Sequence, residues 1–169
     1  MNSELESNYD LYKMDEKLRL KLLLELIWWV LTVVLIWLVL RPIQKNIYDF
    51  PFYIWNIIFI VAFVTFTRII FLLPYTFLAR ALWVKVAIVL LTPLIAYYLF
   101  GGMSLVRNFI DEEGMLSIMR HLVDEDQERL SSYIRREILF FGVGSVVASI
   151  TLALRMLISI FRMRNRGTV

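Results

Sequence analysis

Three ionisable side chains, Glu25, Arg68 and Arg155, lie inside long apolar stretches of this sequence. A lone charge near the middle of a bilayer costs at least about 2.5 kcal/mol, so such side chains usually face protein or water and find partners. One carboxylate and two guanidinium groups favour a salt-bridged polar cluster inside a membrane. With two cations for one carboxylate, the same three residues would also suit an anion or the phosphate of a lipid headgroup.

The rest of the sequence holds few residues of the kinds that catalysis requires. Cysteine is absent, which excludes disulfides, thiolate metal sites and thiol chemistry. The sole histidine, His121, follows Arg120 and is expected at the surface. No serine lies in a nucleophile-elbow context, and no glycine-rich phosphate loop is present. We therefore expect no enzymatic activity, no cofactor and no metal site.

The elements that would position the three charged residues are long apolar segments. A hydrocarbon core about 30 Å thick needs about 20 apolar residues per helix, and four segments approach or exceed this length. We expect them to end near prolines, with Arg41-Pro42 closing the first, Pro51 opening the second and Pro74 ending it. The predicted spans are residues 22–40, 53–73, 82–100 and 138–161.

Composition places these segments in a lipid bilayer. Hydrophobic residues make up 60% of the chain and charged residues 20%, and the mean hydropathy is +0.69; a soluble domain is about 45–50% apolar. The net charge of +3 comes from basic residues near the ends of apolar runs, which favours membrane anchoring over nucleic-acid binding. Strands with alternating polarity are missing, so a β-barrel is rejected. The predicted fold is all-α: a polytopic membrane protein with four transmembrane helices in an antiparallel bundle.

The predicted spans place the three charged residues at one depth. Glu25 lies about three residues into the first span, and Arg68 and Arg155 lie about five and six residues before the ends of the second and fourth spans. At about 1.5 Å per residue, all three sit roughly 5 to 9 Å below the same surface. Glu25 could therefore pair with Arg68, with Arg155 or with both. The alternative is that both arginines reach toward the headgroups while Glu25 faces the interface.

Residues 101–137 form the longest connection, which we expect to be an extracytoplasmic helical loop. Gly101-Gly102 is expected to end the third span, because glycine permits a left-handed helix cap. Apolar residues between Met115 and Val123 recur with helical spacing and predict an amphipathic helix after Gly114. The acidic residues of this loop indicate a solvated face, with a calcium site or a docking patch as the alternative. The spacing of an EF-hand is absent.

Basic residues indicate the orientation of the chain, because cytoplasmic loops are enriched in lysine and arginine. Nine basic residues lie on the side of the termini and seven on the opposite side. We therefore expect residues 1–21 and the basic residues 162–169 to form cytoplasmic tails of a protein of a bacterial inner membrane. The nine are Lys13, Lys17, Arg19, Lys21, Arg80, Lys85, Arg162, Arg164 and Arg166; the seven are Arg41, Lys45, Arg107, Arg120, Arg129, Arg135 and Arg136.

Small residues on the fourth span predict a helix-packing face. Ser145, Ser149 and Ala153 recur every four residues, and Gly144 with Ala148 forms a second row. Such residues allow the backbones of two membrane helices to approach closely. The neighbouring helix could belong to the same chain or to another subunit.

These features predict a small integral membrane accessory or structural subunit. It would act by helix packing and by docking its loop to a membrane partner, either another membrane protein or a second copy of itself. The alternative is a binder or transporter of a small molecule, anion or lipid at the Glu25, Arg68 and Arg155 cluster. A four-span sensory input domain is disfavoured, since only eight residues follow Phe161.

Overall fold

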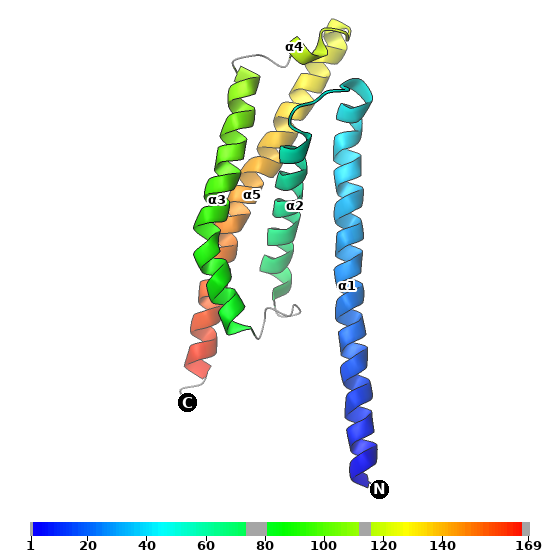
Figure 1. Cartoon of the computed structure of the whole chain (residues 1–169), viewed down its shortest axis with the longest axis vertical. Coiled ribbons are helices and arrows are strands. Elements are labelled where there is room, and N and C mark those ends of the chain that lie inside the picture. Colours follow the sequence, from blue (N-terminus) through cyan, green and yellow to red (C-terminus); the bar gives the residue numbers. More distant parts are fainter. Residues whose placement is uncertain (1, 74–80, 112–115, 167–169) are drawn as a thin grey trace. The chain divides into compact units, whose positions relative to one another are not determined.

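The computed structural model describes residues 2–73, 81–111 and 116–166, and its regular elements there are helices (Figure 1). By internal contacts the chain divides into two units, Met1–Val34 and Leu35–Val169, which are described separately. The four long helices α1, α2, α3 and α5 are each long and apolar enough to cross a membrane. The helices are α1 (Asn2–Asn46), α2 (Tyr53–Leu72), α3 (Leu82–Phe109), α4 (Leu116–Met119) and α5 (Asp124–Arg166).

The first unit is the amino-terminal part of α1. Large apolar side chains such as Leu26 and Val33 are exposed there, as expected for a helix that faces acyl chains. The hydroxyl of Thr32 donates to the carbonyl oxygen of Trp28 at 2.7 Å, so this polar group is satisfied within the helix. The predicted tail, residues 1–21, continues the same helix from Asn2 onward.

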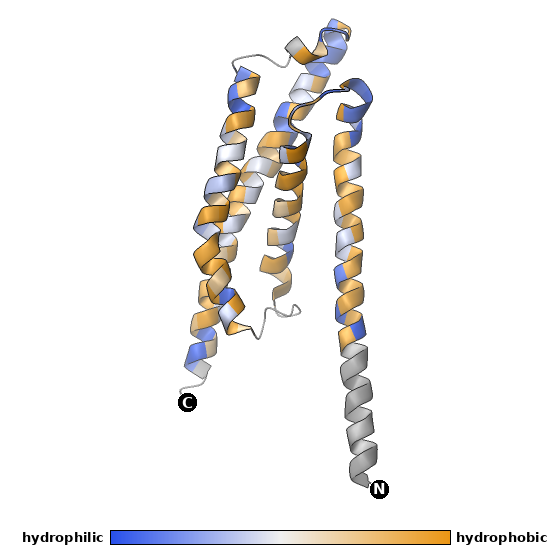
Figure 2. Ribbon diagram, viewed as in Figure 1, coloured by the Kyte–Doolittle hydropathy of each residue, from blue (hydrophilic) through white to orange (hydrophobic). Residues whose placement is uncertain are grey.

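In the second unit, α5 packs against both α2 and α3, which scarcely contact each other. Leu73 follows the end of α2, and it is buried with Leu152 and Met156 of α5. Partly buried apolar residues of α2 and α3 surround this cluster: Phe66, Ile69, Ile70, Ile88 and Val89. Apolar residues dominate the middle of these helices and hydrophilic residues gather toward their ends (Figure 2).

The predicted end of the first helix is wrong. The first helix does not stop at Arg41-Pro42 but continues to Asn46, where the Asn46 side chain donates to the carbonyl oxygen of Pro42 at 2.8 Å. Proline removes one backbone donor, but the remaining backbone hydrogen bonds allow the helix to continue past it. The second helix begins at Tyr53, just after Pro51, and its α-helical part ends at Leu72; Pro74 lies outside the described residues.

The end predicted for the third helix is also wrong, since α3 passes through Gly101 and Gly102 to Phe109. A Cβ on Gly102 would overlap the indole ring of Trp55 in α2, whereas one on Gly101 would meet nothing within 4 Å. Gly102 therefore gives Trp55 room to pack and does not cap the helix.

The region predicted as a loop, residues 101–137, is mostly a continuation of helices α3 and α5. Helix α5 begins at Asp124, well before the predicted span. The predicted amphipathic helix is reduced to α4 (Leu116–Met119). Met119 is fully buried, and residues 112–115 lie outside the described part of the chain.

Candidate functional site

A buried amide and a buried carboxylate meet where α2 and α5 pack together. The Nδ2 atom of Asn56 donates to Oε2 of Glu137 at 2.7 Å, and the two residues are only 1% and 7% exposed. The remaining oxygens of the pair, Asn56 Oδ1 and Glu137 Oε1, are buried and accept no hydrogen bond from the residues that the structure describes. The structure thus leaves two buried acceptors without a donor among the described residues. A buried acceptor that lacks a hydrogen bond is destabilising, so a further donor at this place would be favoured.

Glu137 also lines an open groove of about 830 Å³ that runs along one face of α5. This groove is formed by residues of α5 and by Val39 near the end of α1. Three of its side chains are glutamates and two are arginines, and aromatic rings lie at its carboxyl-terminal end. Its lining residues are Val39, Glu125, Glu128, Arg129, Ser132, Tyr133, Arg136, Glu137, Phe140 and Phe141.

Side-chain contacts attach the end of α1 to the groove and its surroundings. The hydroxyl of Tyr133 donates to the carbonyl oxygen of Val39 at 2.9 Å. The exposed ring of His121 lies 2.8 Å from the carbonyl oxygen of Asn46 through its Nε2 atom. His121 is therefore at the surface, and its contact with Asn46 is structural.

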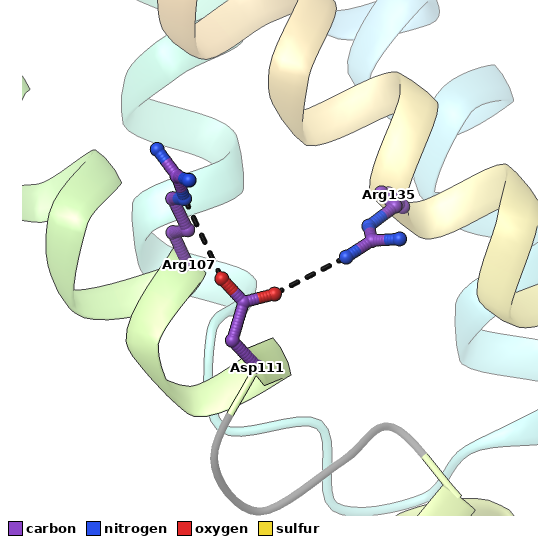
Figure 3. Close-up of polar contacts among 3 residues, drawn as sticks. All are labelled: Arg107, Asp111 and Arg135. Carbon is purple, nitrogen blue, oxygen red and sulfur yellow. Dashed lines mark hydrogen bonds and ion pairs between the residues drawn. The ribbon is translucent and has the colours of Figure 1, made fainter.

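A three-residue ion cluster connects the ends of α3 and α5 that lie near α4 (Figure 3). Asp111 accepts from Nε of Arg107 at 3.5 Å and from Nη2 of Arg135 at 3.1 Å. All three side chains are substantially exposed, so each contact is worth only about 0–1 kcal/mol. The cluster therefore contributes little to stability.

Lys85 is a buried cation that sequence reasoning placed in the wrong environment. It was counted among the basic residues that mark the membrane surface, yet it is 1% exposed. Its ammonium group donates to the hydroxyl of Ser159 in α5 at 3.0 Å and lies 3.9 Å from the sulfur of Met163. Its position inside the predicted third span was the signal that should have placed it with the intramembrane charges.

The three charged residues singled out in the sequence fall in different surroundings. Glu25 is half-buried in the first unit, Arg68 is half-buried on α2, and Arg155 is exposed on α5. The pairing of Glu25 with either arginine stays a prediction.

The small residues of the predicted packing face lie mostly inside the second unit. Ser145, Ala148 and Ser149 are buried, and Ala153 is half-buried. A Cβ on Gly144 would come within 2.9 Å of the Phe63 ring of α2, so this glycine lets the ring pack on α5. The neighbour of this face at Gly144 is thus in the same chain.

Sequence reasoning missed the pairing of Asn56 with Glu137. Asn56 is not among the residues singled out in the sequence, and Glu137 falls at the end of the predicted loop, residues 101–137. The available signal was an isolated asparagine within an apolar span, since such a group needs a partner. Across the described ranges, no three histidine, cysteine, aspartate or glutamate side chains are grouped as metal ligands.

The four apolar helices define the class of this molecule as an integral membrane protein. Comparisons with protein-family models, curated proteins and solved structures found no match.

Proposed function

We propose that this chain is an accessory or structural subunit of a membrane assembly. It docks to a membrane partner through a polar head, which consists of Arg107–Asp111 at the end of α3 and Asp124–Glu137 of α5. The observation that supports the proposal is the set of side-chain contacts that hold this head in place. Contacts from two other helices reach it: Tyr133 donates to the carbonyl oxygen of Val39 in α1, and Asn56 of α2 donates to Glu137. Within the head, Asp111 accepts from Arg135.

The length of α5 supports a head outside the hydrocarbon. The helix has 43 residues, or about 65 Å at 1.5 Å per residue, against a hydrocarbon core of about 30 Å. Its amino-terminal third carries Asp124, Glu125 and Asp126 in the first turn, where acidic groups favour the helix dipole. A charged surface that is already ordered loses little conformational entropy on docking, which favours its use in recognition.

In the proposed topology the spans alternate in direction, both termini are cytoplasmic and the head is extracytoplasmic. Contacts within the second unit support the alternation: Lys85 near the start of α3 meets Ser159 near the end of α5, and Arg107 near the end of α3 is joined through Asp111 to Arg135 nearer the start of α5. Burial of Lys85 leaves eight basic residues on the side of the termini against seven on the other side. The adjacent Arg162 and Arg164 still favour a cytoplasmic terminus.

Labelling from the two sides of the membrane tests this topology. The chain has no cysteine, so Asp126→Cys and Asn165→Cys each introduce a single thiol at an exposed position. We expect an impermeant maleimide to label Asp126→Cys in intact cells and Asn165→Cys only after permeabilisation. Labelling of both positions from the same side would contradict the proposed four crossings.

Site-specific photocrosslinking tests docking through the head. A photoreactive residue is placed either at Asp126 in the head or at Val123 directly before it, and both positions are exposed. In native membranes we expect each position to give one discrete adduct, with the same mass from both. The matched control is Trp83, which is 84% exposed near the start of α3, away from the head. We expect no such adduct there.

The mass of the adduct identifies the kind of partner. A product of twice 20.1 kDa would indicate self-association, and another mass would indicate a different membrane protein. A chain that gives no adduct at either head position, and that purifies in mild detergent as a lone monomer, would defeat the docking proposal.

A further inference from the structure

The side chains of Asn56 and Glu137 each keep one oxygen atom without a donor. Asn56 Nδ2 donates to Glu137 Oε2, while Asn56 Oδ1 and Glu137 Oε1 accept no hydrogen bond from any described residue. Both side chains are more than nine-tenths buried. An ionised carboxylate only accepts hydrogen bonds, and so does the oxygen of an amide. With Glu137 ionised, neither of the two oxygens can therefore satisfy the other.

A single proton on Glu137 removes this deficit. A protonated carboxyl group offers one O–H donor and one acceptor oxygen, and a primary amide also offers both a donor and an acceptor. An acid and an amide can therefore exchange two hydrogen bonds, one from the N–H and one from the O–H. Asn56 already donates the first of these bonds. The two atoms that the second bond would join are the two that lack a donor.

No cation near Glu137 favours its ionised form. Glu137 forms no ion pair within the described part of the chain. Arg129 is paired with Glu125 of the same helix, and the tyrosines on the packed helices are neutral near pH 7. The titratable and charged side chains on the adjoining stretches of these helices are Arg41 of α1, Tyr53 of α2, Arg107 and Asp111 at the end of α3, and Glu125, Glu128, Arg129, Tyr133 and Arg136 of α5.

Burial also favours the neutral acid, because a buried charge without a partner costs far more than a neutral group. Glu137 is the last residue of the polar head. Burial raises its pKa from 4.5 to about 7, although the hydrogen bond from Asn56 lowers it. Glu137 also lines the open groove, so brief contact with water there is sufficient to deliver or remove a proton. The buried oxygens need not admit a larger ligand.

We infer that Asn56 and Glu137 form a proton-binding site that stabilises the packing of α2 on α5. In the protonated state, the Oε1 hydroxyl of Glu137 donates to Oδ1 of Asn56, while Nδ2 of Asn56 donates to Oε2. At higher pH the proton passes to solvent, and a carboxylate stays buried with one donor too few. The packing of α2 on α5 at the head is then weakened. This inference goes beyond docking and does not depend on the partner.

Infrared spectroscopy of the full chain in nanodiscs tests the protonation directly, since a protonated carboxyl group has a carbonyl stretch that a carboxylate lacks. Exposed carboxyl groups are ionised at about pH 6, so a band that remains there reports an unusual group. We expect the unmodified protein to show this band at about pH 6 and to lose it by about pH 8.5. Glu137→Gln should abolish the band. The matched control is Glu128→Gln, at an exposed position in the same groove, which should keep it.

Two further measurements assign the band and identify the partner of the acid. Carbon-13 in the glutamate carboxyl groups of the unmodified protein should move the band to lower frequency, which assigns it to glutamate even if Glu137→Gln fails to fold. In Asn56→Leu the acid loses its amide partner. Its carbonyl band should then move to higher frequency, because the hydrogen bonds to the amide are gone.

The dependence of folding on pH gives an independent test in mixed micelles. The folded-state pKa of Glu137 lies above its ordinary value of 4.5. The stabilisation is therefore complete below about pH 4.5 and is lost as the pH rises through about 7. Glutamine resembles the neutral acid and does not titrate. From about pH 6 to about pH 8.5, we expect the folding equilibrium constant of the unmodified protein to fall about tenfold relative to that of Glu137→Gln.

Three results would overturn the inference. The first is the absence of a protonated glutamate band in the unmodified protein at the lower pH, which would mean that Glu137 is ionised there. The second is a band that persists in Glu137→Gln, or the same pH dependence of folding with and without this change. The third is a band whose frequency is unchanged in Asn56→Leu, which would show that the acid does not pair with the amide.

Discussion

Replacing Gly102 with alanine is expected to destabilise the protein by about 1–3 kcal/mol, the usual cost of overpacking. The new methyl group would overlap the Trp55 ring, which packs between α2 and α3 and lies 5.0 Å from the ring of Tyr98, centroid to centroid. Relief of this clash requires α3 to move away from α2 or Trp55 to leave its position. The measurement is the free energy of unfolding in mixed micelles, followed by circular dichroism.

The preceding residue supplies a matched control for this prediction. Gly101 lies in the same helix with open space around its Cβ position, so Gly101→Ala gains the helix propensity of alanine, up to about 1 kcal/mol. We expect Gly101→Ala to be neutral or stabilising. Adding Trp55→Leu to Gly102→Ala should recover part of the loss. Equal effects of alanine at the two glycines would show that Trp55 does not pack on Gly102.

Replacing Asn56 with leucine is expected to cost about 1–3 kcal/mol, the cost of leaving a buried polar group without its hydrogen-bond partner. The change removes the donor that lies 2.7 Å from Glu137 Oε2 and leaves a buried carboxyl without it. Glu137→Gln keeps an acceptor at the same place and should cost less. The free energy of unfolding of each variant in mixed micelles gives the comparison.

A double-mutant cycle isolates the contact between the two residues. We expect the variant that carries both Asn56→Leu and Glu137→Leu to be less destabilised than the sum of the single changes, because each single change leaves one buried polar group behind. Additive losses, within about 0.5 kcal/mol, would mean that the two side chains do not interact.

Helix ends and side-chain partners were harder to predict than the spans themselves. Gly101-Gly102 looked like a helix stop, because local propensity cannot show that an indole ring 47 residues earlier in the chain occupies the space beside Gly102. The pair of Asn56 and Glu137 is separated by 81 residues, and its existence depends on the register with which α2 packs on α5. The partner of Lys85 depends on packing in the same way, since Ser159 is its neighbour only through the packing of α3 on α5.

The sequence by itself determined the number of apolar helices and their approximate positions. In hydrocarbon, a segment of about 20 consecutive apolar residues can satisfy its backbone polar groups only as a helix. This condition depends on local composition alone. Only the tertiary structure decided that Glu137 joins Asn56, that Lys85 is buried, and that α5 carries a groove of mixed charge. These features depend on the rotation and axial shift of one helix against another, which follow from many side-chain contacts between distant parts of the chain.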